Sequence, residues 1–216
     1  MQAIFDLDGT LLDTVRYAVI TARRTAREFG WAEPTEERVR GAIGLPLPQY
    51  LTTVFPQADL DELTPRYRAS ENEDIQRHGV LFPGIPEMLD QLRAAGVTTA
   101  VCSNGELDYV VTVLDLTGLT DRIDRPTSAR SHASKAAAVA ALVALDQRSV
   151  MVGDTIMDVE AAAANAIPSV GCLYGYGDPA DLARANRTAG SVTEVLTAVR
   201  LCLGLEAAES GWDLAR

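Results

Sequence analysis

The fold is decided by an eight-residue stretch near the start of the chain, Ala3-Ile4-Phe5-Asp6-Leu7-Asp8-Gly9-Thr10. Its apolar beginning is too short for a helix before Gly9, so it predicts a buried strand over residues 2–6. Two carboxylates, Asp6 and Asp8, follow at the end of this strand, and Gly9 lets the backbone turn closely beside them. The stretch therefore predicts a buried strand that ends in an acidic turn.

Farther along the chain, short apolar strands alternate with helices. After the turn signal Pro83-Gly84, strands are predicted over residues 97–102, 149–152 and 169–173. Helices are predicted over residues 86–95, 107–116, 134–145, 158–166 and 192–203. This alternation is typical of parallel βαβ units. We therefore expect an α/β fold with a doubly wound parallel sheet.

A helical segment interrupts the pattern directly after the first strand. Apolar residues recur at helical spacing over residues 14–29. Further helices are predicted from Thr35, over 48–54 and over 59–77. We therefore divide the chain into a core, residues 1–13 and 81–216, and a small all-helical domain, residues 14–80, each boundary being set to within about four residues.

Polar side chains are predicted at the ends of several strands, where doubly wound sheets bind ligands. Besides the two aspartates of the first turn, these ends carry Ser103-Asn104-Gly105 and Gly153-Asp154, with Asp158 one helical turn later. Lys135, the only lysine in the chain, begins a helix before the strand that ends at Asp154. Singly, such residues are often helix caps, turn formers or solvated surface groups. Their combination on one edge of the sheet predicts a reactive site.

The predicted site is suited to phosphoryl transfer. Asp6, Asp154 and Asp158 would concentrate negative charge that a cation must offset, and Mg²⁺ prefers such oxygen ligands and bridges to phosphate. Asp6 could then attack phosphorus and form an aspartyl-phosphate. Asp8 would protonate the leaving oxygen and later deprotonate the attacking water. The candidate phosphate-binding residues are Ser103, Asn104 and Lys135.

Together these segments resemble the four motifs of the haloacid dehalogenase superfamily: Asp6-Leu7-Asp8-Gly9-Thr10, Ser103, Lys135 and Gly153-Asp154-Thr155-Ile156-Met157-Asp158. The resemblance covers nearly the whole chain and implies a Rossmann-like core with a helical cap after the first motif. The segment Leu81-Phe82-Pro83-Gly84-Ile85-Pro86 is similar to the phosphoglycolate phosphatase branch. The resemblance also implies a Mg²⁺ site formed by Asp6, the backbone carbonyl of Asp8, Asp154 and Asp158. One departure is that Lys135 is followed by alanine, where the family often has proline.

Several alternative functions remain open. A dehalogenase or phosphonatase of this family would have tyrosine or alanine in place of Asp8, and a phosphonatase would need a lysine that residues 14–80 do not contain. A β-phosphoglucomutase-like enzyme would have a histidine at the position of Ala18, which favours a hydrolase here. A phospho-accepting receiver-type signalling protein would lack the helical insertion and carry its acceptor on a middle strand. A non-catalytic binding protein would not need Asp6 and Asp8.

Composition limits the partners that we expect. The chain has 30 acidic and 19 basic residues and a formal net charge of -11, which argues against nucleic acid or an anionic membrane as the main partner. Three widely spaced cysteines, Cys102, Cys172 and Cys202, predict reduced thiols, and no N-terminal signal or membrane-spanning run is seen, so we expect a cytoplasmic protein. The expected partner is a small phosphorylated metabolite, and the oligomeric state stays open.

Substrate selectivity is expected to come from the helical insertion. Arg16 lies near the hinge and could reach an anionic substrate. The loop Gly41-Ala42-Ile43-Gly44-Leu45-Pro46 is the better candidate, because the family presents such a loop to the core. We therefore take Arg16, Gly44 and Leu45 as specificity candidates. Phosphoglycolate, sugar phosphates and nucleotides all remain possible substrates.

Overall fold

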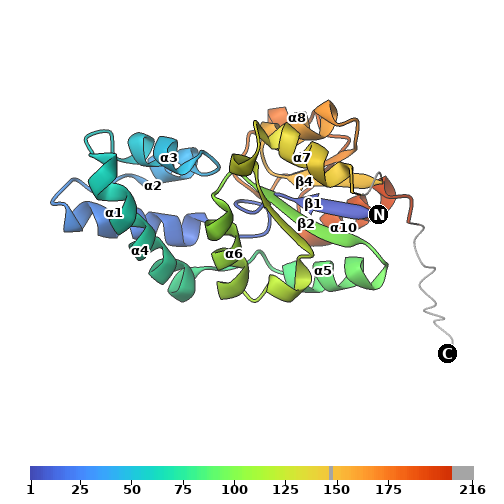
Figure 1. Ribbon diagram of the computed structural model, residues 1–216, viewed down its shortest axis with the longest axis horizontal. Coiled ribbons are helices and arrows are strands. Elements are labelled where there is room, and N and C mark those ends of the chain that lie inside the picture. The colour runs from blue at the N-terminus through green and yellow to red at the C-terminus, as the bar shows by residue number, and fades with distance from the viewer. Residues whose placement is uncertain (146–147, 206–216) are drawn as a thin grey trace.

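A six-stranded parallel sheet forms the centre of the computed structural model, which describes residues 1–145 and 148–205 (Figure 1). The strands are β1 (Gln2–Phe5), β2 (Thr98–Ser103), β3 (Arg125–Ser128), β4 (Ser149–Gly153), β5 (Ser169–Cys172) and β6 (Arg187–Ala189). Their order in the sheet is β3-β2-β1-β4-β5-β6, and every pairing is parallel. The expected α/β fold is thus confirmed. The sheet order reverses beside β1, which places the acidic turn after β1 at the position where such folds bind ligands.

Helices cover both faces of the sheet because its inner strands are apolar on both sides. In β1, Ala3 and Phe5 join one apolar cluster, whereas Ile4 joins a second cluster on the opposite face. The first face is covered by α5 (Ile85–Ala94), α6 (Leu107–Leu116) and α10 (Val192–Cys202). The second is covered by α7 (Lys135–Val143) and α8 (Ile156–Ala164). Figure 1 shows the sheet held between these two layers.

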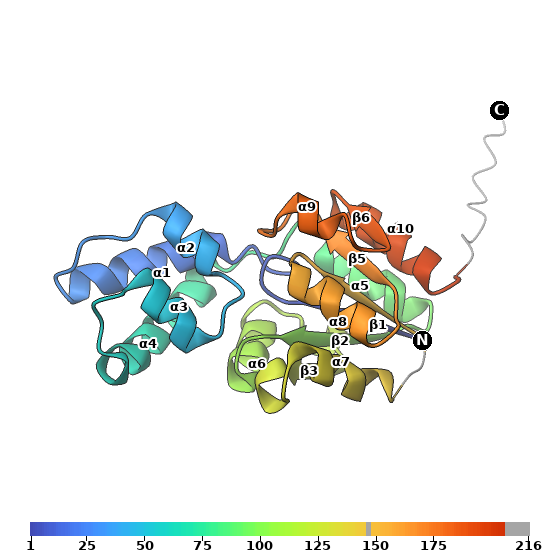
Figure 2. The same ribbon diagram turned by 90° about the horizontal axis from the view of Figure 1, so that it is seen from above.

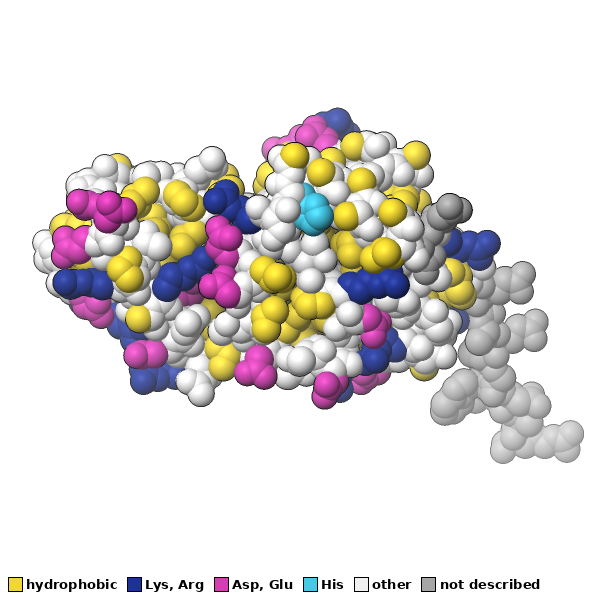
Figure 3. Space-filling model, viewed as in Figure 1, with side chains coloured by type: hydrophobic (Ala, Val, Ile, Leu, Met, Phe, Trp, Pro, Cys, Tyr) yellow, Lys and Arg dark blue, Asp and Glu magenta, His cyan; other side chains and the backbone are white. Residues whose placement is uncertain are grey.

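The insertion after β1 is a bundle of four helices, which we call the cap. It comprises α1 (Val15–Glu28), α2 (Glu36–Ala42), α3 (Leu47–Val54) and α4 (Leu60–His78). Its longest helices, α1 and α4, pack against each other, and Figure 2 shows the cap beside one end of the sheet. Two chain segments connect the cap to the core. Because the first of them directly follows β1, the cap sits at the carboxyl end of this strand. Figure 3 shows a notch on the surface between the two lobes.

The structure also contains elements that the sequence pattern did not predict. These are the edge strands β3 and β6, the short helix α9 (Pro179–Leu182), and two 3₁₀ turns, η1 (Thr120–Arg122) and η2 (Ala129–Ser131). The edge strands are short and polar, so they lack the apolar run that marks β1, β2, β4 and β5. Residues 206–216, whose structure the sequence left ambiguous, lie outside the described residues. In the part of the chain that is described, no helix has the length and apolarity needed to cross a membrane.

Candidate active site

Asp6 follows the last residue of β1 and is only 5% exposed. Its backbone N–H donates to the Val152 carbonyl of β4 at 2.8 Å, so the sheet hydrogen bonding extends through this residue. The backbone of Asp6 is therefore held at the carboxyl end of β1, in the middle of the sheet, and this fixes the position of its carboxylate. A carboxylate held in this way needs little reorganisation before it reacts.

Three buried carboxylates and one ammonium group meet at this edge. Lys135 Nζ lies 2.8 Å from Asp6 Oδ1 and 2.6 Å from Asp158 Oδ1. One carboxylate oxygen from each of Asp6, Asp154 and Asp158 lies within 4.8 Å of the other two. Three buried carboxylates against one lysine leave an uncompensated negative charge, which is costly in the interior unless a cation binds. The residues present thus fit a divalent metal ion with oxygen ligands.

The pKa shifts express the same excess of negative charge. Burial raises the pKa of Asp6 well above its ordinary value; Lys135 opposes this rise, while Asp158 and Asp154 add to it. Burial and then Asp158 raise the pKa of Asp154 to about 7. Burial lowers the pKa of Lys135, but Asp158 and Asp6 raise it by more, so the ammonium group stays charged. A bound cation would favour the ionised carboxylates in the same way as Lys135.

Asp154 is oriented by two segments of the core. Its Oδ2 accepts a 2.7 Å hydrogen bond from the Tyr176 backbone N–H, and its Oδ1 accepts one of 3.3 Å from Thr10 Oγ1. Gly9 has φ +77°, and a Cβ there would collide with the Asp154 carboxylate. Glycine at position 9 thus allows both the turn and the close approach of Asp154.

Asp158 is oriented by the start of helix α8. Its Oδ2 accepts hydrogen bonds from the Thr155 backbone N–H at 3.0 Å and from Thr155 Oγ1 at 2.8 Å. Thr155 is the N-cap of α8, so this contact is part of a capping box. Asp158 Oδ1 is left to Lys135. One carboxylate thus starts the helix and contributes to the acidic cluster.

Asp8 lies two residues after Asp6 and faces the cap. Its Oδ1 accepts hydrogen bonds from Thr14 Oγ1 and from Tyr109 OH, each at 2.7 Å. Burial raises the pKa of Asp8, against the hydrogen bonds from Tyr109 and Thr14, which lower it. A carboxyl group with a raised pKa and a fixed orientation is suited to proton transfer.

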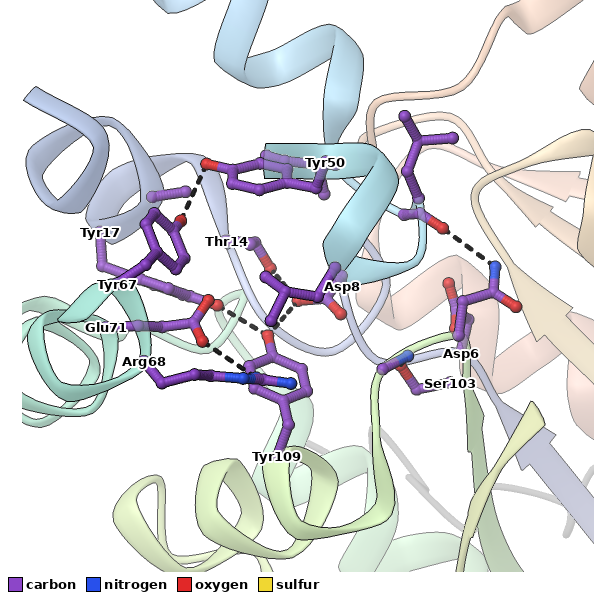
Figure 4. A pocket seen from close by; sticks show the side chains of 17 residues that line it. Asp6, Asp8, Thr14, Tyr17, Tyr50, Tyr67, Arg68, Glu71, Ser103 and Tyr109 are labelled. Carbon is purple, nitrogen blue, oxygen red and sulfur yellow. Dashed lines mark hydrogen bonds and ion pairs between the residues drawn. The ribbon is translucent and has the colours of Figure 1, made fainter. Parts of the chain in front are cut away.

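A pocket with about 580 Å³ of empty space, part of it open to solvent, lies between core and cap (Figure 4). Asp6 and Asp8 belong to its core side, together with residues 103–105 and Tyr109. On the cap side it is lined by Thr14, Tyr17, Ala18, Ile43, Gly44, Leu45, Leu47, Tyr50, Tyr67, Arg68 and Glu71. Figure 4 shows the labelled tyrosines and the Arg68–Glu71 pair on the far side of Asp8 from Asp6. Core and cap together thus form this pocket.

Most of the residues that the sequence singled out lie together at this pocket. Ser103, Asn104, Gly44 and Leu45 line it, and the Asn104 side chain donates to the Gly44 carbonyl at 3.0 Å. The loop of the cap is thereby tied to the strand end that carries Ser103. Arg16 is not among the lining residues, and its Nε pairs with Asp13 Oδ2 at 2.7 Å on the surface.

Sequence reasoning missed the aromatic and charged residues on the cap side of the pocket. Tyr17 and Glu71 sit within long cap helices, where nothing in the sequence distinguishes them from residues that pack the cap itself. Tyr109 had a usable signal, since it lies in the first turn of a helix, six residues after Ser103, and therefore near the same strand end. The geometry as a whole places Asp6 and Asp8 at one pocket, with the Lys135 ammonium group and the carboxylates of Asp154 and Asp158 beside Asp6.

Comparison with known protein families gives a match over most of the chain. Residues 3–172 match the family model described as haloacid dehalogenase-like hydrolase. A phosphoglycolate phosphatase of Agrobacterium fabrum is 35% identical over 190 residues, covering 82% of each chain. A tyrosine-protein kinase, PtkA of Mycobacterium tuberculosis, is 30% identical over 209 residues, which cover 94% of this chain and 72% of the kinase.

Solved structures show the same fold. The crystal structure of a predicted phosphoglycolate phosphatase of Haemophilus somnus superposes with a TM-score of 0.80 at 19% identity, covering 91% of this chain and 96% of the other. A haloacid dehalogenase-like hydrolase of Streptococcus pneumoniae gives a TM-score of 0.77 at 24% identity, with 92% and 98% coverage. At these identities the likeness concerns the fold, including the cap between the first two strands.

Proposed function

The chain belongs to the haloacid dehalogenase-like hydrolase family, and from this premise we propose that it is a Mg²⁺-dependent phosphatase of small phosphate monoesters that works through an aspartyl-phosphate on Asp6. The observation that carries the proposal is the buried cluster of Asp6, Asp154, Asp158 and Lys135 beside the pocket between core and cap. The curated relatives named phosphoglycolate phosphatase support the reaction class. The free cysteines support a reducing compartment, for which we propose the cytoplasm.

The residues of the chain divide the reaction between them. Asp6 attacks phosphorus, and Lys135 and Ser103 hold oxygens of the transferred group. Asp8 gives a proton to the leaving oxygen and then takes one from the water that attacks the intermediate. Asp6, the backbone carbonyl of Asp8, Asp154 and Asp158 would hold Mg²⁺, which supplies positive charge against the phosphate oxygens. The cap excludes bulk water from the pocket.

The cap side of the pocket favours a small substrate with a polar leaving group. Gly44 and Leu45 of the cap loop and the polar side chains of Arg68 and Glu71 face the space beyond Asp8. Two relatives named phosphoglycolate phosphatase make phosphoglycolate the first compound to test, and sugar phosphates and nucleotides follow. Ala18 lies in the pocket where a mutase of this family would carry histidine, so we favour hydrolysis.

The proposal is tested by phosphate release from a panel of phosphorylated metabolites in the presence of Mg²⁺. We expect at least one good substrate, activity that disappears when Mg²⁺ is chelated, and loss of more than about a thousandfold in kcat for Asp6→Asn, because the amide cannot attack phosphorus. Activity that survives this substitution would sink the assignment of Asp6 as nucleophile. A panel that yields a phosphate isomer without release of phosphate would favour the mutase instead.

A second substitution tests the role of Asp8. Asp8→Ala should slow phosphoglycolate and other alkyl esters by about a hundredfold or more, because their leaving oxygens need a proton. Aryl phosphates with stable leaving groups should be slowed less. Equal losses on both kinds of ester would argue against Asp8 as the general acid.

A further inference from the structure

A chain of buried hydroxyl groups runs from the cap to Asp8. Tyr17, on cap helix α1, places its OH 2.7 Å from the OH of Tyr109, on core helix α6. The Tyr109 OH in turn lies 2.7 Å from Asp8 Oδ1. Tyr17 is 1% exposed and Tyr109 8%, so water has little access to either hydroxyl group. Figure 4 shows both rings directed toward Asp8 from different elements.

The proton count fixes the direction of this chain. A phenol has one proton to donate. Tyr109 donates it to Asp8, so the hydrogen bond between the two phenols must be donated by Tyr17. Burial raises the pKa of both phenols well above the ordinary value, and nearby Asp8 adds to the rise, so both hydroxyl groups keep their protons. The sequence is therefore Tyr17 OH to Tyr109 OH to Asp8 Oδ1.

The same contacts divide the two oxygens of Asp8 between different tasks. Oδ1 accepts from both Thr14 and Tyr109, which occupy its two lone pairs. Oδ2 has no such partner among the described residues, so it is the oxygen left to exchange a proton with substrate or water. Without the hydrogen bond from Tyr109, the Asp8 carboxyl group could rotate, and Oδ2 would no longer be the oxygen held toward substrate or water.

We propose that Tyr109, supported by Tyr17, is a positioning residue that orients Asp8 for proton transfer when the cap is closed over the core. Tyr17 belongs to the cap and Tyr109 to the core, so their hydrogen bond exists only while the two lobes are together. Closure of the cap thus completes the orientation of the acid/base group. The inference rests on the proposed phosphatase function and adds residues that act on Asp8 rather than on phosphate.

The test uses two aryl phosphates of similar shape, p-nitrophenyl phosphate and phenyl phosphate, which differ in how much their leaving oxygen needs a proton. Tyr109→Phe should reduce kcat/KM for phenyl phosphate by about tenfold, which is a fraction of the factor that acid–base catalysis contributes. For p-nitrophenyl phosphate the reduction in kcat/KM should be less than about twofold. Tyr17→Phe should change the two rates in the same direction by smaller factors. Because Tyr17 acts through Tyr109, adding Tyr17→Phe to Tyr109→Phe should change neither rate further.

The matched control is Tyr67→Phe. The Tyr67 OH lies in the same pocket, but it donates to Tyr50 at 2.9 Å and no hydrogen bond joins it to Asp8. Whatever its effect on binding, this variant should change both aryl phosphates by the same factor. All three variants keep the ring, and thermal unfolding checks that each is folded.

The outcomes separate this inference from the proposed function. Equal losses on the two aryl phosphates for Tyr109→Phe, or additive losses in the double variant, would overturn the positioning role while the enzyme remains a phosphatase. An unsubstituted protein that releases no phosphate from either ester or from the metabolite panel would overturn both.

Discussion

Glu71 shows how strongly burial acts on a single residue of this pocket. It lies on α4 with 7% of its surface exposed, and its Oε2 accepts from Arg68 Nη1 at 3.1 Å. Burial raises the pKa of Glu71 to about 7; Arg68 opposes this rise and Asp8 adds to it. The ion pair with Arg68 thus does not offset the loss of hydration, to which the Asp8 carboxylate adds a smaller unfavourable interaction.

The shift predicts a pH-dependent contribution of Glu71 to stability, which a substitution at this position isolates from those of the other carboxyl groups. Its pKa is higher in the folded chain than its ordinary value of 4.5, so its contribution to stability is complete below pH 4.5 and is lost as pH rises through about 7. Glu71→Gln removes this loss. Between pH 5 and pH 8 the variant should therefore gain stability relative to the unsubstituted protein, by about 3 kcal/mol at most. Urea unfolding at the two pH values measures the difference.

Glu62→Gln is the control, because Glu62 is an exposed carboxylate of the same helix that forms an ion pair with Arg66. It reports the effect of removing any acidic group from α4. If the free energy of unfolding of Glu71→Gln changes with pH as much as that of the unsubstituted protein, the prediction is contradicted.

At the scale of elements, the sequence predicted what depends on local patterns and missed what depends on neighbours. The inner strands β1, β2, β4 and β5 were predictable because burial on both faces requires continuous apolar runs. The edge strands β3 and β6 were not, because their polar residues become strands only by pairing with β2 and β5. The aspartates could be grouped because parallel strands end at one edge. The contact of Tyr17 with Tyr109 depends on how the cap packs on the core, which no local pattern encodes.

The end of β4 gives a prediction of its own. Gly153 is the last residue of this strand, and a Cβ there would collide with the Asp158 carboxyl group at the start of α8. Gly153→Ala should therefore displace Asp158 from Thr155 and Lys135. We expect about a 10–100-fold loss of Mg²⁺ affinity in a calorimetric titration, as for other changes beside metal ligands.

The same substitution in the cap provides the control. Gly41 lies within helix α2, and a Cβ there would meet open space. Gly41→Ala should leave Mg²⁺ affinity unchanged and raise stability by about 0.5–1 kcal/mol, because alanine favours the helix. If Gly153→Ala binds Mg²⁺ as tightly as Gly41→Ala does, the close packing of β4 against α8 does not control the cation site.

For the whole molecule, the acidic cluster links metal binding to folding. Asp6 is far in the sequence from Asp154 and Asp158, so the three carboxylates meet only in the folded chain. A cation that binds them therefore stabilises the folded state, by about 2.7 kcal/mol at a concentration one hundred times its Kd. For a chain of this size we expect the unfolding temperature to rise by about 5–10 °C. Thermal unfolding with and without Mg²⁺, at matched ionic strength, measures this rise.

Asp154→Asn separates metal binding from charge repulsion. The amide cannot ionise, so the metal-free variant should be more stable than the metal-free unsubstituted protein, in which burial and Asp158 disfavour the Asp154 carboxylate. It should also lose most of the rise in unfolding temperature with Mg²⁺. Asp181→Asn, in the short helix α9, removes a carboxylate outside the cluster and should keep the full rise. An equal rise in Asp154→Asn and Asp181→Asn would show that Mg²⁺ acts on the overall charge of -11 rather than at this cluster.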